Sequence, residues 1–347
     1  MTNSFLTIRK GNINSLKNLD DKSHNKIFSS FSWIITWLNT YKIELGNVNL
    51  YTIYSNNELV ALAPFYLQKT EGLLKLTTLY PLGQGEPERS EIASEYNDIY
   101  ILEGYETEVL HILSKELKKL KIDQIKWRAS LKDSHINRLL KATFHYQPTP
   151  THARYLIERS TWSLDNLSKN TRSRYKRSLN QLTDINASFK WVGKNDYEHF
   201  SQILAQFHQT RWNNKGCAGA FAEKDFQSFH KSYRATNPCN IKISAIMVNN
   251  KPIAINYYLA DESTLYFYQC GWDERNYANL SPGFALHLWS IEHCNFEWYD
   301  FMMGGLNDSY KAKFGSKKIS MVNNHVIINK RKYNFHRLIN KLLNYFN

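Results

Sequence analysis

Thr264-Leu-Tyr-Phe-Tyr-Gln-Cys270 begins the most informative segment of this chain. Aromatic and β-branched residues dominate these positions, so they predict a β-strand. A polar loop, 271–282, follows, and a helix is expected to open at Gly283. The next predicted strand ends in Trp298-Tyr-Asp-Phe-Met302. In such a strand–loop–helix–strand unit, the helix N-terminus presents backbone N–H groups and a positive dipole end to the loop, which suits an anionic ligand.

The elements before this segment occur twice in the chain. Two predicted strands joined by Asn249-Asn250 span 243–258, and two joined by Asn56-Asn57 span 51–66. Asn tolerates the positive φ that a tight hairpin turn requires. Each hairpin also follows a segment with helical spacing that contains tryptophan. The repetition predicts two copies of one α/β unit, and the alternative is coincidence between common hairpins.

We therefore predict an α/β (α+β) fold of two tandem units, each with a mixed central sheet flanked by helices. The boundary is expected near Gln147-Pro-Thr-Pro-Thr151, because this segment can continue neither a helix nor a central strand. The predicted units are 1–150 and 151–325. Residues 326–347 are expected to form a basic amphipathic helix.

The composition is that of a globular protein: 42% of the residues are hydrophobic and 14% are aromatic. The sequence contains no run of about 18 apolar residues, so no membrane-spanning helix is predicted. Residues 1–11 lack the apolar stretch of a secretory signal. The four cysteines form no CxxC pair and no His cluster lies beside them. We therefore expect no metal site, no disulfide scaffold and a cytoplasmic location.

The formal net charge of +13 predicts an anionic partner. One basic segment, 169–177, could be a solvated helix face or could bind RNA, nucleotide phosphates or an anionic glycan. Since the chain has no helix-turn-helix, finger or RNP-type motif, sequence-specific nucleic-acid binding is not expected. The other basic segment is the amphipathic helix 326–347. It either packs on its own unit or lies in an anionic membrane surface, which would make the protein peripheral to the inner membrane.

Three motifs resemble the FemAB-like branch of the GNAT acyltransferase superfamily, and within it the cellulose-biosynthesis CelD type. They are Phe267-Tyr-Gln-Cys-Gly-Trp-Asp273, Tyr277-Ala-Asn-Leu-Ser-Pro-Gly283, and Tyr299-Asp-Phe-Met-Met-Gly304 followed by Tyr310-Lys311. The resemblance covers nearly the whole chain. It implies two tandem GNAT-like units that transfer an acyl group to an amine or hydroxyl of a sugar or of a cell-envelope or polysaccharide precursor.

The resemblance also implies acyl-CoA as the cosubstrate, with Arg275, Ser281, Gly283 and Lys311 binding it. Ordinary GNAT enzymes hold the pyrophosphate with a Gln/Arg-x-x-Gly-x-Gly/Ala loop, whereas the matching loop here has one glycine, at its end. Fewer glycines leave fewer backbone amides able to approach a diphosphate. Aminoacyl-tRNA, the donor of FemAB-type enzymes proper, is therefore an alternative, with 169–177 as its binding segment. A further alternative is a non-catalytic member that binds a glycan or a biosynthetic partner.

The candidate catalytic residues are Asp300, His208 and Tyr310. Asp300 lies in an aromatic strand, where a carboxylate partly removed from water could act as a general base, although it could equally bond to local backbone amides. His208 is a second candidate base, and Tyr310 could return a proton to the leaving thiolate. Cys270 is expected to be a buried apolar residue and no nucleophile, because no His lies nearby in sequence to activate it. Direct transfer is then the simpler mechanism.

The predicted substrate-binding residues are Arg211, Trp212, Gln269, Asp273 and Asp98. Arg211 suits a phosphate or carboxylate, which a guanidinium binds through two hydrogen bonds. Strict alternation would place Gln269 on the strand face opposite Tyr266 and Tyr268, with one face lining a substrate channel. Asp98, from the first unit, would complete a cleft.

Overall fold

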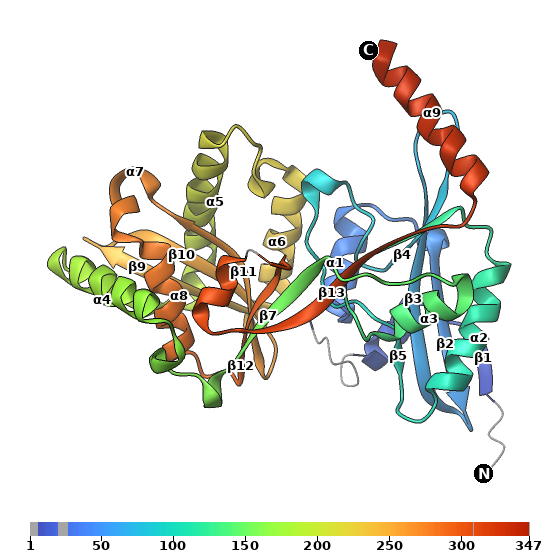
Figure 1. Ribbon diagram of the computed structural model, residues 1–347, viewed down its shortest axis with the longest axis horizontal. Coiled ribbons are helices and arrows are strands. Elements are labelled where there is room, and N and C mark those ends of the chain that lie inside the picture. The colour runs from blue at the N-terminus through green and yellow to red at the C-terminus, as the bar shows by residue number, and fades with distance from the viewer. Residues whose placement is uncertain (1–5, 20–26, 308, 347) are drawn as a thin grey trace. The chain divides into compact units, whose positions relative to one another are not determined.

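The computed structural model describes residues 6–19, 27–307 and 309–346, which form two compact units. The first comprises the described residues of 1–87, 92–152 and 320–347, and the second comprises 88–91 and the described residues of 153–319. Each unit has a mixed sheet flanked by helices (Figure 1). The predicted fold class, two tandem mixed α/β units, is therefore confirmed. None of the helices in the described part of the chain is long and apolar enough to cross a bilayer.

The first unit has the strand order β1-β2-β3-β4-β6-β13, with β5 beside β3. Neighbouring strands pair antiparallel except β4 and β6, which are parallel. The strands are β1 (Leu6–Lys10), β2 (Val48–Ser55), β3 (Glu58–Lys69), β4 (Thr77–Pro81), β5 (Tyr100–Ile101), β6 (Gln124–Leu131) and β13 (Lys317–Ile327). The helices are α1 (Phe31–Thr40), α2 (Glu106–Lys119), α3 (His135–Phe144) and α9 (Lys330–Phe346).

The second unit has the strand order β7-β12-β11-β10-β9-β8. It also contains one parallel pair among those recorded, β11 with β12. The strands are β7 (His152–Glu158), β8 (Ser188–Trp191), β9 (Ile241–Val248), β10 (Lys251–Ala260), β11 (Thr264–Trp272) and β12 (Trp298–Gly305). The helices are α4 (Lys169–Asp184), α5 (Tyr197–Asn214), α6 (Lys224–Thr236), α7 (Glu274–Tyr277) and α8 (Pro282–His293).

The two predicted Asn-Asn hairpins are confirmed. Asn56 and Asn57 have φ of 48° and 67°, and Asn249 and Asn250 have φ of 49° and 60°. Two consecutive positive φ values define the hairpin turn that matches the right-handed twist of paired strands. Both hairpins also shift register shortly before or after the turn. The two units therefore share the same hairpin structure.

The last strand departs from the predicted domain boundaries. Residues 320–325 were expected in the second unit, but β13 pairs with β6 from Met321 opposite Leu131 to Ile327 opposite Gln124. The helix that follows remains with the first unit, because Lys332 Nζ lies 2.6 Å from an Asp123 carboxylate oxygen. A strand that returns to a distant partner is specified by its ladder of hydrogen bonds, which sequence order does not reveal.

A β-bulge in β11 corrects the predicted alternation. Tyr257 pairs with Gln269 and Tyr258 with Phe267, so Tyr268 is the extra residue. A bulge shifts the side chains beyond it to the other face. Consequently Gln269 lies on the same side as Tyr268, where both line a small cavity, and Cys270 turns toward α8. The prediction that Gln269 and Tyr268 lie on opposite faces is wrong.

Helices pack closely on both faces of β11. On one face, α8 shares a core with residues of β10 and β11. On the other face, α5 lies so near that a Cβ at Gly271 would come 2.8 Å from Phe207 Cβ and 3.0 Å from the Leu204 carbonyl oxygen. Only glycine fits there without moving the helix. The carboxyl end of β11 is thus held firmly between α5 and α8.

Candidate active site

The second unit opens where β11 and β12 separate. Their parallel pairing covers three residues of each strand and ends with Tyr266 opposite Asp300. β11 nevertheless continues to Trp272, and β12 to Gly305. Beyond this fork, the recorded pairing of β11 with β12 does not continue. Parallel strands that separate at their carboxyl ends leave room for a ligand there.

Asp300 explains why the strands separate. Its carboxylate is fully buried and accepts a hydrogen bond of 2.7 Å from the Met302 amide. Met302 has φ of 61°, an uncommon value for a residue with a side chain, so β12 turns away from a regular ladder at this point. Arg154 Nε, on β7, donates to the same carboxylate at 2.8 Å. Asp300 therefore stabilises the bend in β12.

A pocket of about 330 Å³ occupies this part of the unit. It is lined from β11, the end of α5, the start of α8 and the turn after β12. The lining residues are Arg174, Arg211, Cys270, Trp272, Ala278, Ser281, Gly283, Phe284, His287, Tyr310, Lys313 and Phe314. Three of them are cationic and none is a carboxylate. The pocket is therefore suited to a ligand with negative charge.

The cationic end of the pocket lies at the start of α8. Arg174, on α4, donates to the Ser281 hydroxyl at 3.1 Å, and its guanidinium carbon lies 4.4 Å from the Phe284 ring centroid. Ser281 has φ of 53°, and its carbonyl oxygen already accepts from the amides of Phe284 and Ala285 at 3.1 Å each. Fewer amides are available than the sequence predicted. Side-chain cations, together with the helix dipole, then account for most of the attraction for an anion.

Arg211, near the end of α5, lines the pocket beside the carboxyl end of β11. Its guanidinium carbon lies 4.1 Å from the centroid of the Trp272 ring, and its Nε lies 3.1 Å from a Glu274 carboxylate oxygen. Trp272 in turn packs against α8, since a Cβ at Gly283 would come 3.0 Å from the indole. Gly283 is thus required for close packing, which is a different role from the predicted backbone approach to phosphate.

His287 lies beside the apolar part of the pocket. The imidazole is almost fully buried, and its ring centroid is 4.3 Å from that of Phe267. Burial lowers the pKa of His287 to about 3, and the charge of Lys311 acts in the same direction. The imidazole is therefore neutral at physiological pH.

Hydrogen bonds define which nitrogen of His287 carries the proton. Nδ1 lies 2.9 Å from the Tyr299 hydroxyl, which itself donates to the Tyr258 hydroxyl at 3.4 Å. Asn256 Nδ2 donates to the same Tyr258 oxygen at 2.9 Å. Because Tyr299 donates onward, we assign the His287 proton to Nδ1, as the donor to Tyr299. Nε2 then carries a lone pair on the ring that lines the pocket.

Two further polar groups line the pocket. Burial raises the pKa of the Cys270 thiol to about 11, so this sulfur is protonated at neutral pH. That agrees with the expectation that Cys270 is no nucleophile. The Tyr310 side chain as a whole is 48% exposed, but removal of water around its hydroxyl, followed by the nearby Cys270, raises the pKa of Tyr310, which keeps the hydroxyl protonated. The ring centroids of Tyr310 and His287 are 6.5 Å apart.

Several predicted site residues have other roles. His208 accepts from Trp212 Nε1 at 2.9 Å, and burial, followed by the Arg211 charge, lowers the pKa of His208 to about 4. Lys311 Nζ donates to the carbonyl oxygens of Phe301 and Met303 at 2.6 Å each, so it holds the β12 backbone. Neither His208 nor Lys311 lines the pocket, and their predicted roles as base and donor ligand are not supported.

The remaining predicted residues also lie outside the pocket lining. Arg275 is exposed on α7, and Asp273 caps that helix by accepting from the Asn276 amide at 3.2 Å. Gln269 lines the cavity beneath α6. Asp98, in the first unit, accepts from the amides of His135 and Ile136 at 2.9 and 2.8 Å, which makes it a cap for α3.

The structure therefore brings together Arg211, Ser281, Gly283 and Tyr310 of the predicted set. Sequence reasoning missed His287, Trp272 and Lys313, and it noted Arg174 only within a basic segment. The available signal for His287 was an imidazole between apolar residues of α8, four positions after Gly283. A lone buried His is usually structural, so the sequence alone could not select it.

Comparisons with known proteins concern the family and the fold. Residues 169–312 match the family model described as an acetyltransferase (GNAT) domain. The chain is similar to the crystal structure of FemX, with 11% identity, 95% of this chain and 99% of that chain covered, and a TM-score of 0.61. No curated protein sequence matches significantly.

Two further solved structures are similar over most of their length. One is the C-terminal domain (DUF2156) of a putative lysylphosphatidylglycerol synthetase from Agrobacterium fabrum, with 10% identity, 93% and 94% coverage, and a TM-score of 0.53. The other is a conserved protein of unknown function from Bacteroides thetaiotaomicron, with 11% identity, 93% and 100% coverage, and a TM-score of 0.52.

Residues 169–312, in the second unit, are thus similar to the acetyltransferase (GNAT) domain family, and the solved structures are similar to the chain in fold. At 10–11% identity, the solved structures establish the fold of the whole chain and leave its substrates open. The finer resemblance to CelD-type proteins stays a prediction.

Proposed function

We propose that this protein is an N- or O-acyltransferase that uses acyl-CoA and acts on an amine or hydroxyl of a sugar or another cell-envelope precursor. The observation that carries the proposal is the pocket at the β11–β12 fork, where three cationic side chains and a neutral imidazole meet without a carboxylate in the lining. The acetyltransferase match over 169–312 supports the same class of reaction.

The residues fit a donor with a phosphorylated carrier and a thin acyl-bearing arm. Arg174 and Lys313 would hold the phosphates near the start of α8, and Arg211 would assist from the end of the sheet. The arm would follow the fork toward Cys270 and His287. When bound, acyl-CoA supplies an activated carbonyl. The residues of this chain then bind it, exclude water and move protons.

Proton transfer is assigned to His287. As the acceptor nitrogen or oxygen bonds to the acyl carbon, its proton becomes strongly acidic, so even a weakly basic imidazole can accept it at Nε2. Tyr310 would donate its hydroxyl proton to the departing sulfur, and His287 would return the proton it holds to the Tyr310 oxygen. Backbone amides near the carboxyl end of β11 would stabilise the negative oxygen.

A second donor is favoured by one observation. The side chains of Lys169, Arg174, Lys176 and Arg177 are exposed on α4, and Arg174 also lines the pocket. This surface could hold the backbone of aminoacyl-tRNA with the charged end in the pocket. The structural similarity to FemX is compatible with that alternative.

Ligand-dependent melting distinguishes the two donors. We expect CoA and acetyl-CoA to raise the melting temperature, because a ligand at 100 times its Kd adds about 2.7 kcal/mol to the free energy of unfolding. Uncharged tRNA should have no more effect than duplex DNA of similar length at physiological salt. Stabilisation by tRNA alone would select the aminoacyl-tRNA alternative, and no effect of any of these ligands would favour a non-catalytic protein.

Arg174→Gln should weaken CoA binding about tenfold. The substitution removes a charge-assisted hydrogen bond worth about 1.5–3 kcal/mol, with part of the loss offset by solvent. The measurement is the Kd for CoA by calorimetry. Arg177→Gln is the matched control, since it makes the same change on the same helix outside the pocket lining. Equal losses in both variants would mean that α4 attracts CoA only through its overall charge.

A further inference from the structure

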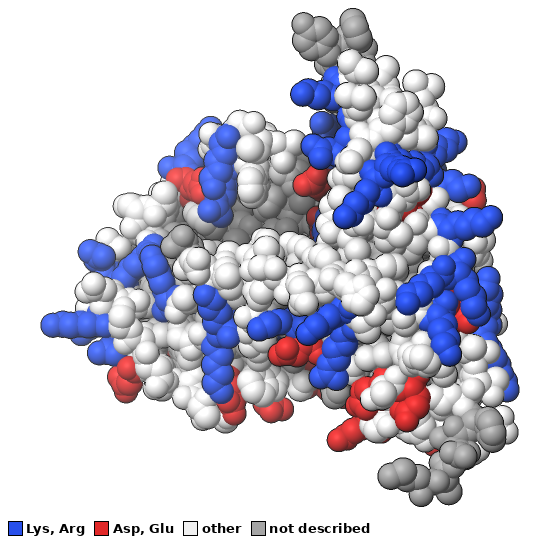
Figure 2. Space-filling model, turned by 45° about the vertical axis from the view of Figure 1, so that its right-hand side comes forward, with Lys and Arg blue, Asp and Glu red and all other residues white. Residues whose placement is uncertain are grey.

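The last helix of the chain differs in composition from the others. α9 (Lys330–Phe346) reads KRKYNFHRLINKLLNYF, with five Lys or Arg residues and no Asp or Glu. Its positive charge is therefore not balanced within the helix. Figure 2 shows blue Lys and Arg side chains gathered around this helix on the visible face.

An apolar face of α9 is exposed to solvent. Phe335 is 58% exposed, Leu338 55%, Leu342 51% and Leu343 43%. Phe335, Leu338 and Leu342 follow one another at intervals of three and four, which places them on one side of the helix. Exposed apolar side chains are ordinary when isolated, but a continuous face of this kind indicates an interaction surface.

Contacts near the start of α9 hold the helix to the first unit. Lys332 Nζ lies 2.6 Å from an Asp123 carboxylate oxygen, and Asn329 Nδ2 donates to the same carboxyl group at 3.1 Å. The Tyr333 ring packs on His325, with centroids 5.7 Å apart. Within the first unit, α9 extends from the end of β13 beside the turn between β3 and β4 (Figure 1).

A basic groove of about 770 Å³ runs between α9 and the sheet of the first unit. Its lining includes Lys126 on β6 and Arg337, Leu338 and Lys341 on α9. Arg337 and Lys341 are four residues apart and so share a stripe beside the apolar face. Phosphate groups could occupy the groove while apolar chains contact the helix face.

From this arrangement we propose that α9 binds an anionic membrane surface. The face formed by Phe335, Leu338, Leu342 and Leu343 enters the boundary between headgroups and acyl chains, and the flanking cations contact lipid phosphates. Charge complementarity selects this partner. A second copy of the same helix would bring two sets of uncompensated positive charges together, whereas an anionic bilayer neutralises them.

Co-sedimentation of the full chain with lipid vesicles tests the proposal. We expect binding to vesicles that contain phosphatidylglycerol, little binding to pure phosphatidylcholine vesicles, and release at high salt. Leu338→Ser/Leu342→Ser should weaken binding on the order of a hundredfold. Arg337→Gln/Lys341→Gln should weaken it about thirtyfold, since each charge near the surface contributes about fivefold.

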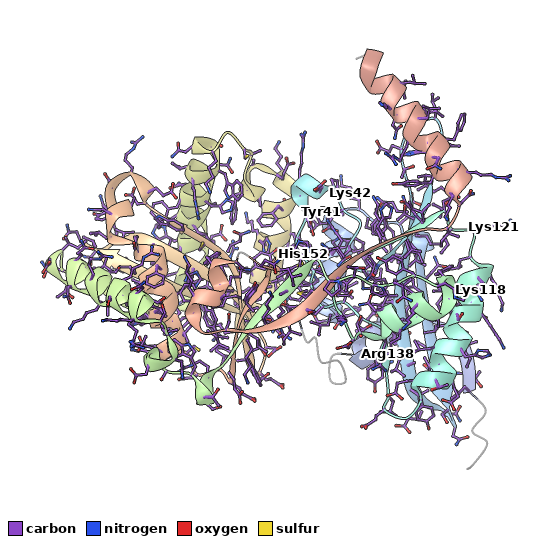
Figure 3. The ribbon with its side chains drawn as sticks, viewed as in Figure 1. Tyr41, Lys42, Lys118, Lys121, Arg138 and His152 are labelled. Atoms are coloured by element: carbon purple, nitrogen blue, oxygen red, sulfur yellow. The ribbon has the colours of Figure 1, made fainter. Side chains whose placement is uncertain are left out.

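Matched controls change residues of the same kind elsewhere in the first unit. Leu45→Ser/Leu73→Ser replaces two apolar residues that are 60% and 83% exposed. Lys118→Gln/Lys121→Gln removes two exposed charges at the end of α2 and just after it (Figure 3). Neither control should change vesicle binding by more than about twofold. Melting curves of all four variants exclude unfolding as the cause.

Three results would overturn the proposal. They are equal binding to neutral and anionic vesicles, equal losses in the control pairs, and absence of binding to either vesicle. Sedimentation velocity tests the competing explanation, that the apolar face joins two copies of the chain. A dimer that dissociates in Leu338→Ser/Leu342→Ser, in a protein that does not bind vesicles, would support that explanation.

Discussion

His287→Gln is expected to lower kcat by about 10²–10⁴-fold, with little change in the Kd for CoA. The imidazole is the basic group on the pocket wall, and the hydrogen bond from Nδ1 to Tyr299 leaves Nε2 as the acceptor. Gln preserves a polar side chain of similar reach, so the pocket should keep its shape. Steady-state rates with saturating donor, together with calorimetric binding, separate the two effects.

The pH dependence gives a second readout of His287. Because burial lowers its pKa to about 3, the imidazole stays in its neutral, proton-accepting form throughout the range from about pH 5 to 8. Its protonation should therefore cause no acid loss of kcat/KM above about pH 5. A loss centred near the ordinary histidine pKa of about 6.5, absent in His287→Gln, would show that the ring is solvated and would contradict the burial described above.

His293→Gln is the matched control for that variant. His293 lies on the same helix, is exposed, and bonds through Nδ1 to the Trp289 carbonyl oxygen at 2.8 Å. Its replacement should leave kcat within about twofold. If both substitutions lowered kcat alike, the effect would belong to the stability of α8, and the assignment of His287 as the base would be wrong.

Asp300→Ala is expected to lower the free energy of unfolding by about 3 kcal/mol or more. Removing one partner of a buried ion pair leaves the other without its counter-charge, at a typical cost of about 3–5 kcal/mol. Here the substitution also removes the acceptor for the Met302 amide, 2.7 Å away. Chemical denaturation at neutral pH measures the loss. Glu158→Gln, which breaks an exposed pair with Lys317, is the control and should have little effect.

Asp300→Asn distinguishes a structural carboxylate from a catalytic one. Asn can still accept from the Met302 amide, so the bend in β12 should persist in the fraction that is folded. We expect kcat per folded molecule to fall less than tenfold, whereas loss of a general base costs about 10²–10⁴-fold. A loss in that larger range, with the melting temperature unchanged, would restore the sequence-based assignment of Asp300.

The sequence predicted the fold through local signals that the structure keeps. Asn-Asn turns specify hairpins by their tolerance of positive φ, and Gln147-Pro-Thr-Pro-Thr151 lies just before the start of the second unit. Two features of the fold were not predicted because each depends on residues that are far apart in the sequence. β13 returns to β6 across the chain, and the bulge at Tyr268 arises from how β10 and β11 pair.

The candidate site was predicted less well than the fold, and Asp300 illustrates why. The sequence around a carboxylate at a strand end is the same whether the side chain faces a ligand or an arginine. Here the side chain faces Arg154, which lies 146 positions earlier in the chain and forms an ion pair with it. His287 was overlooked for the converse reason, because its role depends on a Tyr299 hydroxyl on a neighbouring strand and on the carboxyl end of β11. The types of residue in 264–313 indicated where the site lies. The role of each residue, however, depends on contacts with residues far away in the sequence.

Hydrogen–deuterium exchange of the full chain, with and without a non-transferable thioether analogue of acyl-CoA, tests the central claim most directly. The fork should hold the donor, so saturating analogue should protect amides at the end of β11 and the start of α8, roughly 267–287, and leave the first unit unchanged. Arg174→Gln should need a higher analogue concentration for the same protection. Protection confined to other segments, or none at saturation, would contradict the assignment of this pocket as the donor site.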